Sequence, residues 1–158
     1  MQIYKSTNKQ IRAFTLIEML VVISLIGILA ALALVSFGGA QKQARDTTRK
    51  SDLKQYQTSV EGYASKNGGL YPVYANAITL TGSIVFCGST QLNIGTCIAD
   101  PKTGTLDYKY VSTDGINYVF WGTLENKTPT VYWVVCSNGK TGEKSGSAPS
   151  SSSSTCPI

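Results

Sequence analysis

One uninterrupted apolar stretch near the beginning of the sequence limits the folds open to this chain more than any other feature. The stretch runs from Phe14 to Phe37 and contains a single charged residue, Glu18, among its 24 residues. As an α-helix rising about 1.5 Å per residue, it would extend roughly 36 Å, enough to cross the ~30 Å hydrocarbon core of a bilayer. The sequence therefore predicts a membrane-spanning helix at residues 14–37, with a single further domain on its C-terminal side.

The short segment before this helix sets its expected orientation. It is polar and carries the cations Lys5, Lys9 and Arg12. The positive-inside rule places these residues in the cytoplasm and sends the C-terminal domain outward. A rival interpretation is an ordinary secretory signal, because Ala31-Leu32-Ala33 has the small-x-small pattern of a signal peptidase site. Cleavage there would release a soluble protein that begins at Leu34.

Glu18 is the unusual residue of the apolar stretch. A carboxylate near the centre of a spanning helix costs about 2.5–3.5 kcal/mol on insertion scales and commonly marks function. The alternative is that Glu18 lies close enough to the basic flank to reach the lipid headgroups. An ordinary signal peptide accounts for Glu18 badly, because its apolar region should contain no acid. We therefore interpret Glu18 as a functional residue.

The residues Ala13-Phe14-Thr15-Leu16-Ile17-Glu18, between a basic leader and the apolar helix, resemble the class III signal of type IV prepilins and pseudopilins. In that family a membrane-embedded prepilin peptidase cuts immediately before the Phe and N-methylates the new terminus. The resemblance implies a leader peptide at residues 1–13, cleavage between Ala13 and Phe14, and methylation of Phe14. The family usually has Gly before the cut, whereas this chain has Ala13, a small side chain that still suits a tight protease subsite.

Glu18 is the fifth residue counted from Phe14, as the family's glutamate is in the mature chain. The cut would create an amino group whose positive charge is costly in lipid, and Glu18 can neutralise it. Within one chain the two groups lie on the same helix face, because positions four apart are neighbours. The resemblance implies instead that the carboxylate pairs with the N-terminus of an adjacent subunit and sets axial register during assembly. The spacing by itself leaves both pairings open.

The helix is predicted to continue beyond the membrane over residues 38–67. Apolar or small residues recur at steps of three and four from Leu53 onward, as in a helix laid against a sheet. Asn67-Gly68-Gly69 supplies a C-terminal stop. Three glycines are candidate hinges that would let the helix bend. The alternative is that they only weaken the helix locally or allow close packing against another helix. The three are Gly27, Gly38 and Gly39.

Residues 68–144 are predicted to form a small antiparallel β domain, which together with the long N-terminal helix gives an α+β, pilin-like fold. The Thr113-Asp114-Gly115 sequence is a strong turn signal. Alternating aromatic and aliphatic residues indicate a sheet buried on one face, and the aromatic residues at 108–133 are interpreted as core rather than as a ligand site. The expected strands are Ser83–Cys87, Leu106–Ser112, Ile116–Leu124 and Thr130–Ser137.

Four cysteines follow the apolar helix, and an even number in an exported domain indicates two disulfides. Three pairings exist, of which we favour Cys87–Cys97 and Cys136–Cys156. A zinc site made of four thiolates is the alternative, but no two cysteines have the C-x₂₋₄-C spacing of such sites. Many proteins of the pilin family close their C-terminal region with a disulfide, which agrees with this interpretation.

Two further features are a set of three aspartates and the C-terminal tail. Asp100, Asp107 and Asp114 offer oxygen ligands for calcium, which some pseudopilins and minor pilins hold in a nearby loop, but turn-forming aspartates are common for backbone reasons. Residues 145–158 form a serine-rich tail of low complexity that is expected to pack no core, with Cys156 as its restraint. The exposed hydroxyl groups would also permit glycosylation.

Composition excludes several function classes. The net charge of +5 falls to +2 from Phe14 onward (11 Lys and Arg against 9 Asp and Glu), too weak a charge to indicate a nucleic-acid surface. The sequence contains no histidine, which removes the usual nucleophile–histidine machinery and histidine-based metal helices. No phosphate-binding glycine loop is present. We therefore expect neither an enzyme nor a cofactor.

The sequence predicts a structural subunit of a type IV pilus-like filament. The resemblance implies three kinds of partner: other pilin subunits, prepilin peptidase and an inner-membrane assembly platform, with the lipid bilayer as the environment before assembly. The precursor is expected in the cytoplasmic membrane and the product in an extracellular filament. Alternatives are a type II secretion pseudopilin in the periplasm, a DNA-uptake pilin, and, from another class, a membrane-anchored binding domain that never polymerises.

Overall fold

The computed structural model describes residues 14–102, 104 and 106–158. The chain divides into two compact units at the bond between Gly38 and Gly39. The first unit, as far as it is described, is the N-terminal part of helix α1 (Leu16–Lys66). The second unit, which we call the globular unit, comprises residues 39–158 and contains the rest of α1. Its architecture confirms the predicted α+β class.

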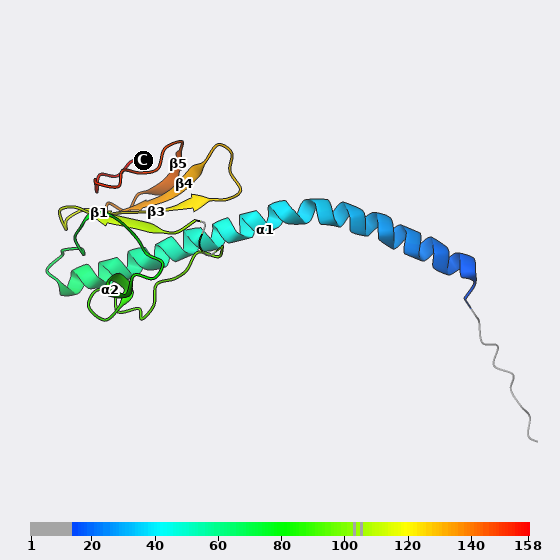
Figure 1. The fold of residues 1–158 in the computed structure, drawn as a ribbon, viewed down its shortest axis with the longest axis horizontal. Coiled ribbons are helices and arrows are strands. Elements are labelled where there is room, and N and C mark those ends of the chain that lie inside the picture. The colour runs from blue at the N-terminus through cyan, green and yellow to red at the C-terminus, as the bar shows by residue number, and fades with distance from the viewer. Residues whose placement is uncertain (1–13, 103, 105) are drawn as a thin grey trace, which may run out of the picture. The chain divides into compact units, whose positions relative to one another are not determined.

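Five antiparallel strands form the sheet of the globular unit, in the simple order β1-β2-β3-β4-β5. Each strand therefore pairs with its neighbour in sequence (Figure 1). The strands are β1 (Tyr74–Thr79), β2 (Lys109–Ser112), β3 (Val119–Leu124), β4 (Val131–Cys136) and β5 (Thr141–Ser145).

Helix α1 ends where the sequence predicts. Its last residue is Lys66, and Gly68 and Gly69 follow with φ of 66° and 84°. This left-handed backbone favours glycine, because a Cβ there is strained. The turn lets the amide of Gly69 donate to the carbonyl of Ala64 at 2.8 Å, which satisfies one of the free carbonyls at the helix end.

One face of the sheet packs against α1 and forms the main core. The apolar stripe of the helix is buried as predicted, with Leu53, Tyr56 and Val60 inaccessible to solvent. The rings of Phe86 and Tyr110 lie 4.6 Å apart between centroids, so the aromatic residues are packed together as core. The other buried members of this cluster are Leu80, Cys87, Leu92, Tyr108, Tyr118, Phe120 and Val135.

The expectation that only one face of the sheet is buried is wrong. A second buried cluster, which we call the outer cluster, lies on the other face and consists of Val111, Val119, Trp121, Val134 and Cys136. The alternation of apolar and polar residues did not predict this burial, because β3 is buried on both faces. A strand that is covered on both sides has a nearly continuous run of apolar residues instead of an alternating one.

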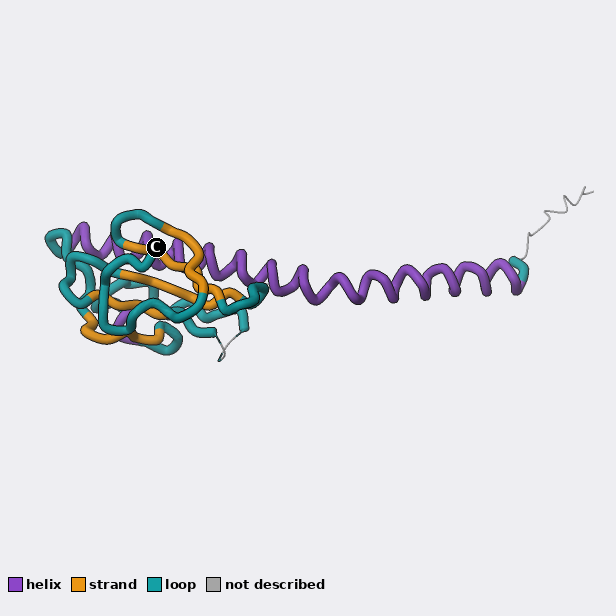
Figure 2. The backbone as a smooth tube through the Cα atoms, turned by 90° about the horizontal axis from the view of Figure 1, so that it is seen from above, coloured by secondary structure: helices purple, strands orange, loops and turns teal. Residues whose placement is uncertain are grey.

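The serine-rich tail covers this second face, contrary to the expectation that it packs no core. Cys156 and Ile158 pack against the outer cluster, and the carbonyl of Ser151 accepts a 2.6 Å hydrogen bond from the amide of Ala77 in β1. Both views place the end of the chain over the strands (Figure 1 and Figure 2). The composition of this segment alone indicates disorder. It is nevertheless held by the packing of Ile158, by the disulfide of Cys156 and by its backbone hydrogen bond to β1.

The predicted strand Ser83–Cys87 is also wrong, because this segment forms the single-turn helix α2 (Ile84–Cys87). A short apolar run does not distinguish strand from helix. Here the amide of Gly88 donates to the carbonyl of Ile84 at 2.8 Å and closes a helical turn. Strands β1 and β5 were missed, because β1 has few large apolar residues and β5 is an edge strand with none. The other three predicted strands exist but are shorter.

The glycine at position 122 permits the contact between helix and sheet. A Cβ there would lie 2.9 Å from Cδ1 of Tyr108 and 3.4 Å from Cδ1 of Leu53. Tyr108 is unable to move aside, because its hydroxyl donates to Asp52 at 2.6 Å. We expect Gly122→Ala to lower the free energy of unfolding by about 1–3 kcal/mol through overpacking.

Gly62→Ala is the matched control for this prediction. Gly62 is exposed on α1 with nothing within 4 Å of a Cβ, so alanine should raise the free energy of unfolding by about 0.5–1 kcal/mol through helix propensity. Urea denaturation followed by tryptophan fluorescence measures both changes. Equal effects of the two variants would contradict the packing assigned to Gly122.

Candidate assembly site and the ion network of the globular unit

Helix α1 begins with a reciprocal cap formed by Thr15 and Glu18. Glu18 Oε2 accepts hydrogen bonds from the Thr15 amide at 3.0 Å and from the Thr15 hydroxyl at 2.9 Å. In return, the Glu18 amide donates to Thr15 Oγ1 at 3.3 Å. This is the capping box, in which residues three apart satisfy each other's free amides at a helix start. The carboxylate also lies where the helix dipole favours a negative charge.

Apolar side chains surround this capped carboxylate and leave it accessible. Phe14, Leu16 and Ile17 are all largely exposed. By length and composition, residues Leu16–Leu34 form the one helix in the described part of the chain that is suited to crossing a membrane, and none of this segment is buried within the protein. An exposed apolar surface of this size marks a site of interaction with a membrane or with other proteins.

The structure places the residues of the predicted processing site only in part. Ala13 lies outside the described residues, and Phe14 is exposed next to the helix start. Thr15 was not recognised from the sequence as a partner of Glu18, although the Thr-x-x-Glu pattern before an apolar run is the signal of a capping box. The predicted cleavage and methylation stay predictions.

The three candidate hinge glycines all lie within α1, and none has a neighbouring atom within 4 Å of a Cβ. The boundary between the two compact units falls between Gly38 and Gly39. Among the described residues of the single chain, no close packing therefore requires glycine at these positions. Bending there stays a prediction.

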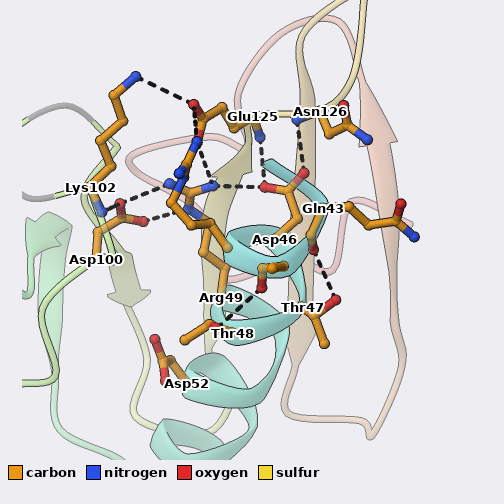
Figure 3. A network of polar contacts seen from close by, with 12 residues as sticks. Gln43, Asp46, Thr47, Thr48, Arg49, Asp52, Asp100, Lys102, Glu125 and Asn126 are labelled. Atoms are coloured by element: carbon orange, nitrogen blue, oxygen red, sulfur yellow. Dashed lines mark hydrogen bonds and ion pairs between the residues drawn. The ribbon is translucent and has the colours of Figure 1, made fainter. Parts of the chain in front are cut away.

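A buried ion network attaches two loops of the globular unit to α1 (Figure 3). At its centre is Arg49, whose side chain is completely buried. Its guanidinium donates two hydrogen bonds to Asp100, at 2.6 and 2.9 Å, and a third to Asp46 at 2.7 Å. Asp46 in turn accepts the backbone amides of Glu125 and Asn126 at 2.7 and 2.8 Å. One turn of helix thus fixes both the segment at Asp100 and the β3–β4 connection.

Burial and hydrogen bonds between charged groups shift the pKa values of several residues in and near the network. Burial by itself would lower the pKa of Arg49, but hydrogen bonds to Asp100 and Asp46 raise this pKa above its ordinary value. The hydrogen bond from Arg45 lowers the pKa of Glu125 to about 2, with Lys102 adding to the effect. Burial raises the pKa of Asp52, opposed by the hydrogen bond from Tyr108. The network is therefore held by an arginine cation that stays charged at neutral pH.

The three aspartates considered for calcium are not brought together as one site, because each has separate partners. Asp100 binds Arg49 and the amide of Lys102, and Asp107 accepts a hydrogen bond from Thr81. Asp114 accepts the amides of Ile116 and Asn117 in the β2–β3 turn. The sequence did not indicate that Arg49 is buried at the centre of an ion network, because a charged residue on a helix with other charged residues is ordinarily exposed to solvent.

Both disulfides lie in the globular unit. Cys87 bonds to Cys97 and Cys136 bonds to Cys156, with sequence separations of 10 and 20. These are the two pairs that we favoured from the sequence. The first closes the loop after α2, and the second ties the tail to the last residue of β4.

An apolar N-terminal helix with one capped carboxylate, continuing into an α+β unit with an antiparallel sheet, is the architecture of a pilin-like protein. Comparison with known proteins finds similarities to the N-terminal part of such proteins. The prokaryotic N-terminal methylation motif matches residues 8–34. The type IV major pilin protein PilA of Myxococcus xanthus is 37% identical over 71 residues, which cover 45% of this chain and 32% of that protein. The motif and the similarity to PilA support a type IV pilin-like protein.

Two chlamydial relatives, each named "Putative outer membrane protein", are also similar. The relative from Chlamydia muridarum is 40% identical over 51% of this chain and 66% of its own length. The relative from Chlamydia trachomatis is 37% identical over 52% of this chain and 68% of its own length. The chain thus spans about a third of the Myxococcus protein and about two thirds of the chlamydial proteins. No solved structure matches the chain significantly.

Proposed function

We propose that this chain is a non-catalytic structural subunit of a type IV pilus-like filament. The observation that carries the proposal is the single carboxylate, Glu18, held at the start of a wholly exposed apolar helix. Cleavage between Ala13 and Phe14 removes the leader, and methylation follows at Phe14. The apolar helix then leaves the lipid and is buried against the helices of other subunits.

The capping box supports a role for Glu18 in this assembly. In the separate chain its carboxylate is satisfied by Thr15 alone and has no cation as a partner among the described residues. An N-terminal amino group of a neighbouring subunit would supply that cation. Since an unpaired buried charge is far more costly than a paired one, the contact would reject subunits in the wrong axial register.

The first experiment determines the N-terminal sequence and the mass of the protein from membranes and from sheared cell-surface material. We expect a chain beginning at N-methylated Phe14 in both fractions. A chain beginning at Leu34 would overturn the proposal in favour of a secreted domain. A chain beginning at Met1 and confined to the membrane would leave only an anchored domain.

Substitutions of Glu18 separate its charge from its capping role. Glutamine at this position still forms a capping box with Thr15, but it is unable to neutralise an amino group. We expect Glu18→Gln and Glu18→Ala both to be processed and both to be absent from sheared filaments. Ser24→Ala, one to two turns along the same exposed helix, should assemble normally. Normal filaments from Glu18→Gln would show that the charge is not the assembly contact.

A further inference from the structure

The C-terminal end of helix α1 and the loop after α2 border a hollow of about 350 Å³. The helix side supplies Tyr63 and, just past the end of α1, Asn67, and the loop side supplies residues 89–93. The volume lies within the range of about 300–1,000 Å³ that small-ligand sites occupy. Neither Glu18 nor any residue of the ion network lines this hollow.

The lining of the hollow is polar and almost uncharged. Among the described residues that form it, Lys66 is the only charged one and Leu92 the only aliphatic one. The others are a glycine, a tyrosine, and residues with hydroxyl or amide side chains. An apolar ligand would leave these polar groups without partners, and an anion would find a single cation. The lining therefore suits a neutral ligand that has several hydroxyl groups.

Existing hydrogen bonds decide which polar atoms of the lining remain for a ligand. Nδ2 of Asn67 donates to a backbone carbonyl one turn earlier at 2.8 Å, which leaves Oδ1 as an acceptor. Oε1 of Gln91 accepts the hydroxyl of Tyr74 at 3.0 Å, which leaves the amide hydrogens of Gln91 as donors. The hydroxyl of Ser59 donates to the carbonyl four residues earlier at 2.9 Å, so its oxygen is still able to accept. The hollow thus offers both donors and acceptors, as a hydroxyl group requires.

Tyr63 forms an aromatic wall of the hollow, and the opposite wall is fixed in place. The ring of Tyr63 is partly buried and packs against the main core. In the loop, the amide of Leu92 donates to the carbonyl of Phe86 at 3.0 Å, and the Cys87–Cys97 disulfide closes the segment. A site that is already ordered loses little conformational entropy when it binds a ligand.

We propose that this hollow binds a neutral carbohydrate. A sugar ring has C–H groups on its faces and hydroxyl groups around its rim. The C–H groups suit the electron-rich face of Tyr63, while the hydroxyl groups match the amides of Asn67 and Gln91. The site uses neither Glu18 nor the apolar helix, so it is independent of the proposed assembly contact. It gives the globular unit a binding activity beyond the structural role of the chain.

Saturation-transfer difference NMR of the full chain in dodecylphosphocholine tests this site, because that detergent has no sugar headgroup. The probes are the methyl glycosides of galactose, mannose and N-acetylglucosamine. At the affinity per atom of ordinary small ligands, a monosaccharide should bind with a Kd of about 1 mM. We expect at least one of the three to bind. Binding of none of them to the folded protein would overturn the proposal. Displacement of the bound glycoside by inorganic phosphate would do so as well, because it would assign the hollow to anions.

A substitution that fills the hollow locates the binding. Gly62 lines the hollow at an exposed helical position, where a Cβ meets nothing within 4 Å. Gly62→Phe should therefore fold normally and raise the Kd at least about tenfold. Gln55→Phe lies two turns earlier on the same exposed side of α1 and outside the hollow. This matched control should keep the wild-type Kd.

Gln91→Met tests the donor side of the site. Methionine keeps the length of the side chain but has no amide hydrogens, so binding should weaken about three- to tenfold through the loss of one hydrogen bond. The melting temperature of each variant confirms that it is folded. Wild-type affinity in Gly62→Phe, or in Gln91→Met, would overturn the assigned site. Either result would leave the proposed function standing, because that function is judged by N-terminal processing and by filaments from the Glu18 variants.

Discussion

Arg49→Met is expected to lower the free energy of unfolding by about 3–5 kcal/mol, because it leaves buried carboxylates without their cation. Methionine keeps most of the length of the side chain, so the loss of stability comes from removal of the guanidinium group and not from a cavity. The buried Asp100 would lose both of its hydrogen bonds from Arg49, and Asp46 would lose one. Urea denaturation of the full chain in detergent measures the change, since both tryptophans, Trp121 and Trp133, lie in the sheet.

Arg45→Met is the matched control for Arg49. Arg45 also binds a carboxylate, Glu125, but its side chain is 29% exposed and Lys102 still reaches Glu125 after the substitution. Partly solvated pairs contribute about 0–1 kcal/mol, so this variant should be nearly as stable as the wild type. Adding Asp100→Asn to Arg49→Met should restore part of the lost stability by removing the unpaired charge. Equal stabilities of the two single variants would contradict the network.

Removing the second disulfide, as Cys136→Ala/Cys156→Ala, is expected to lower the free energy of unfolding by about 3 kcal/mol for a closed loop of this length. Its sequence separation is 20. The variant should also release the tail from the outer cluster, which exposes Val111, Val119 and Trp121. Acrylamide quenching of tryptophan fluorescence and binding of a hydrophobic dye should both increase while the sheet persists.

Cys87→Ala/Cys97→Ala is the control for the tail. Its sequence separation is 10, and halving the loop length reduces the stabilisation by only about 0.6 kcal/mol. The two double variants should therefore lose similar stability, but only the first should increase quenching of Trp121. Unchanged quenching after removal of the Cys136–Cys156 bond would show that the tail does not depend on it to cover the sheet.

The residues of the apolar helix could be interpreted from sequence because membrane crossing depends on length and polarity, both of which are local properties. The same holds for the helix stop, where Gly68 and Gly69 supply a left-handed backbone. The stripe that begins at Leu53 identified the buried face of α1 because helical periodicity is written in consecutive residues. Glu18 was recognised by its isolation in that stretch, although its partner Thr15 was not.

Sequence by itself thus determined the apolar helix, the α+β class, and the segments of β2, β3 and β4. Tertiary structure decided the features that depend on contacts between distant residues. Arg49 is buried only because Asp100, 51 residues away, reaches it. The tail is ordered only because β1 and β4 offer it a backbone bond and a cysteine. The physical reason is that the burial of a residue depends on which distant segments pack against it. The type of a residue, whether a charged side chain or one serine in a run, does not reveal those contacts.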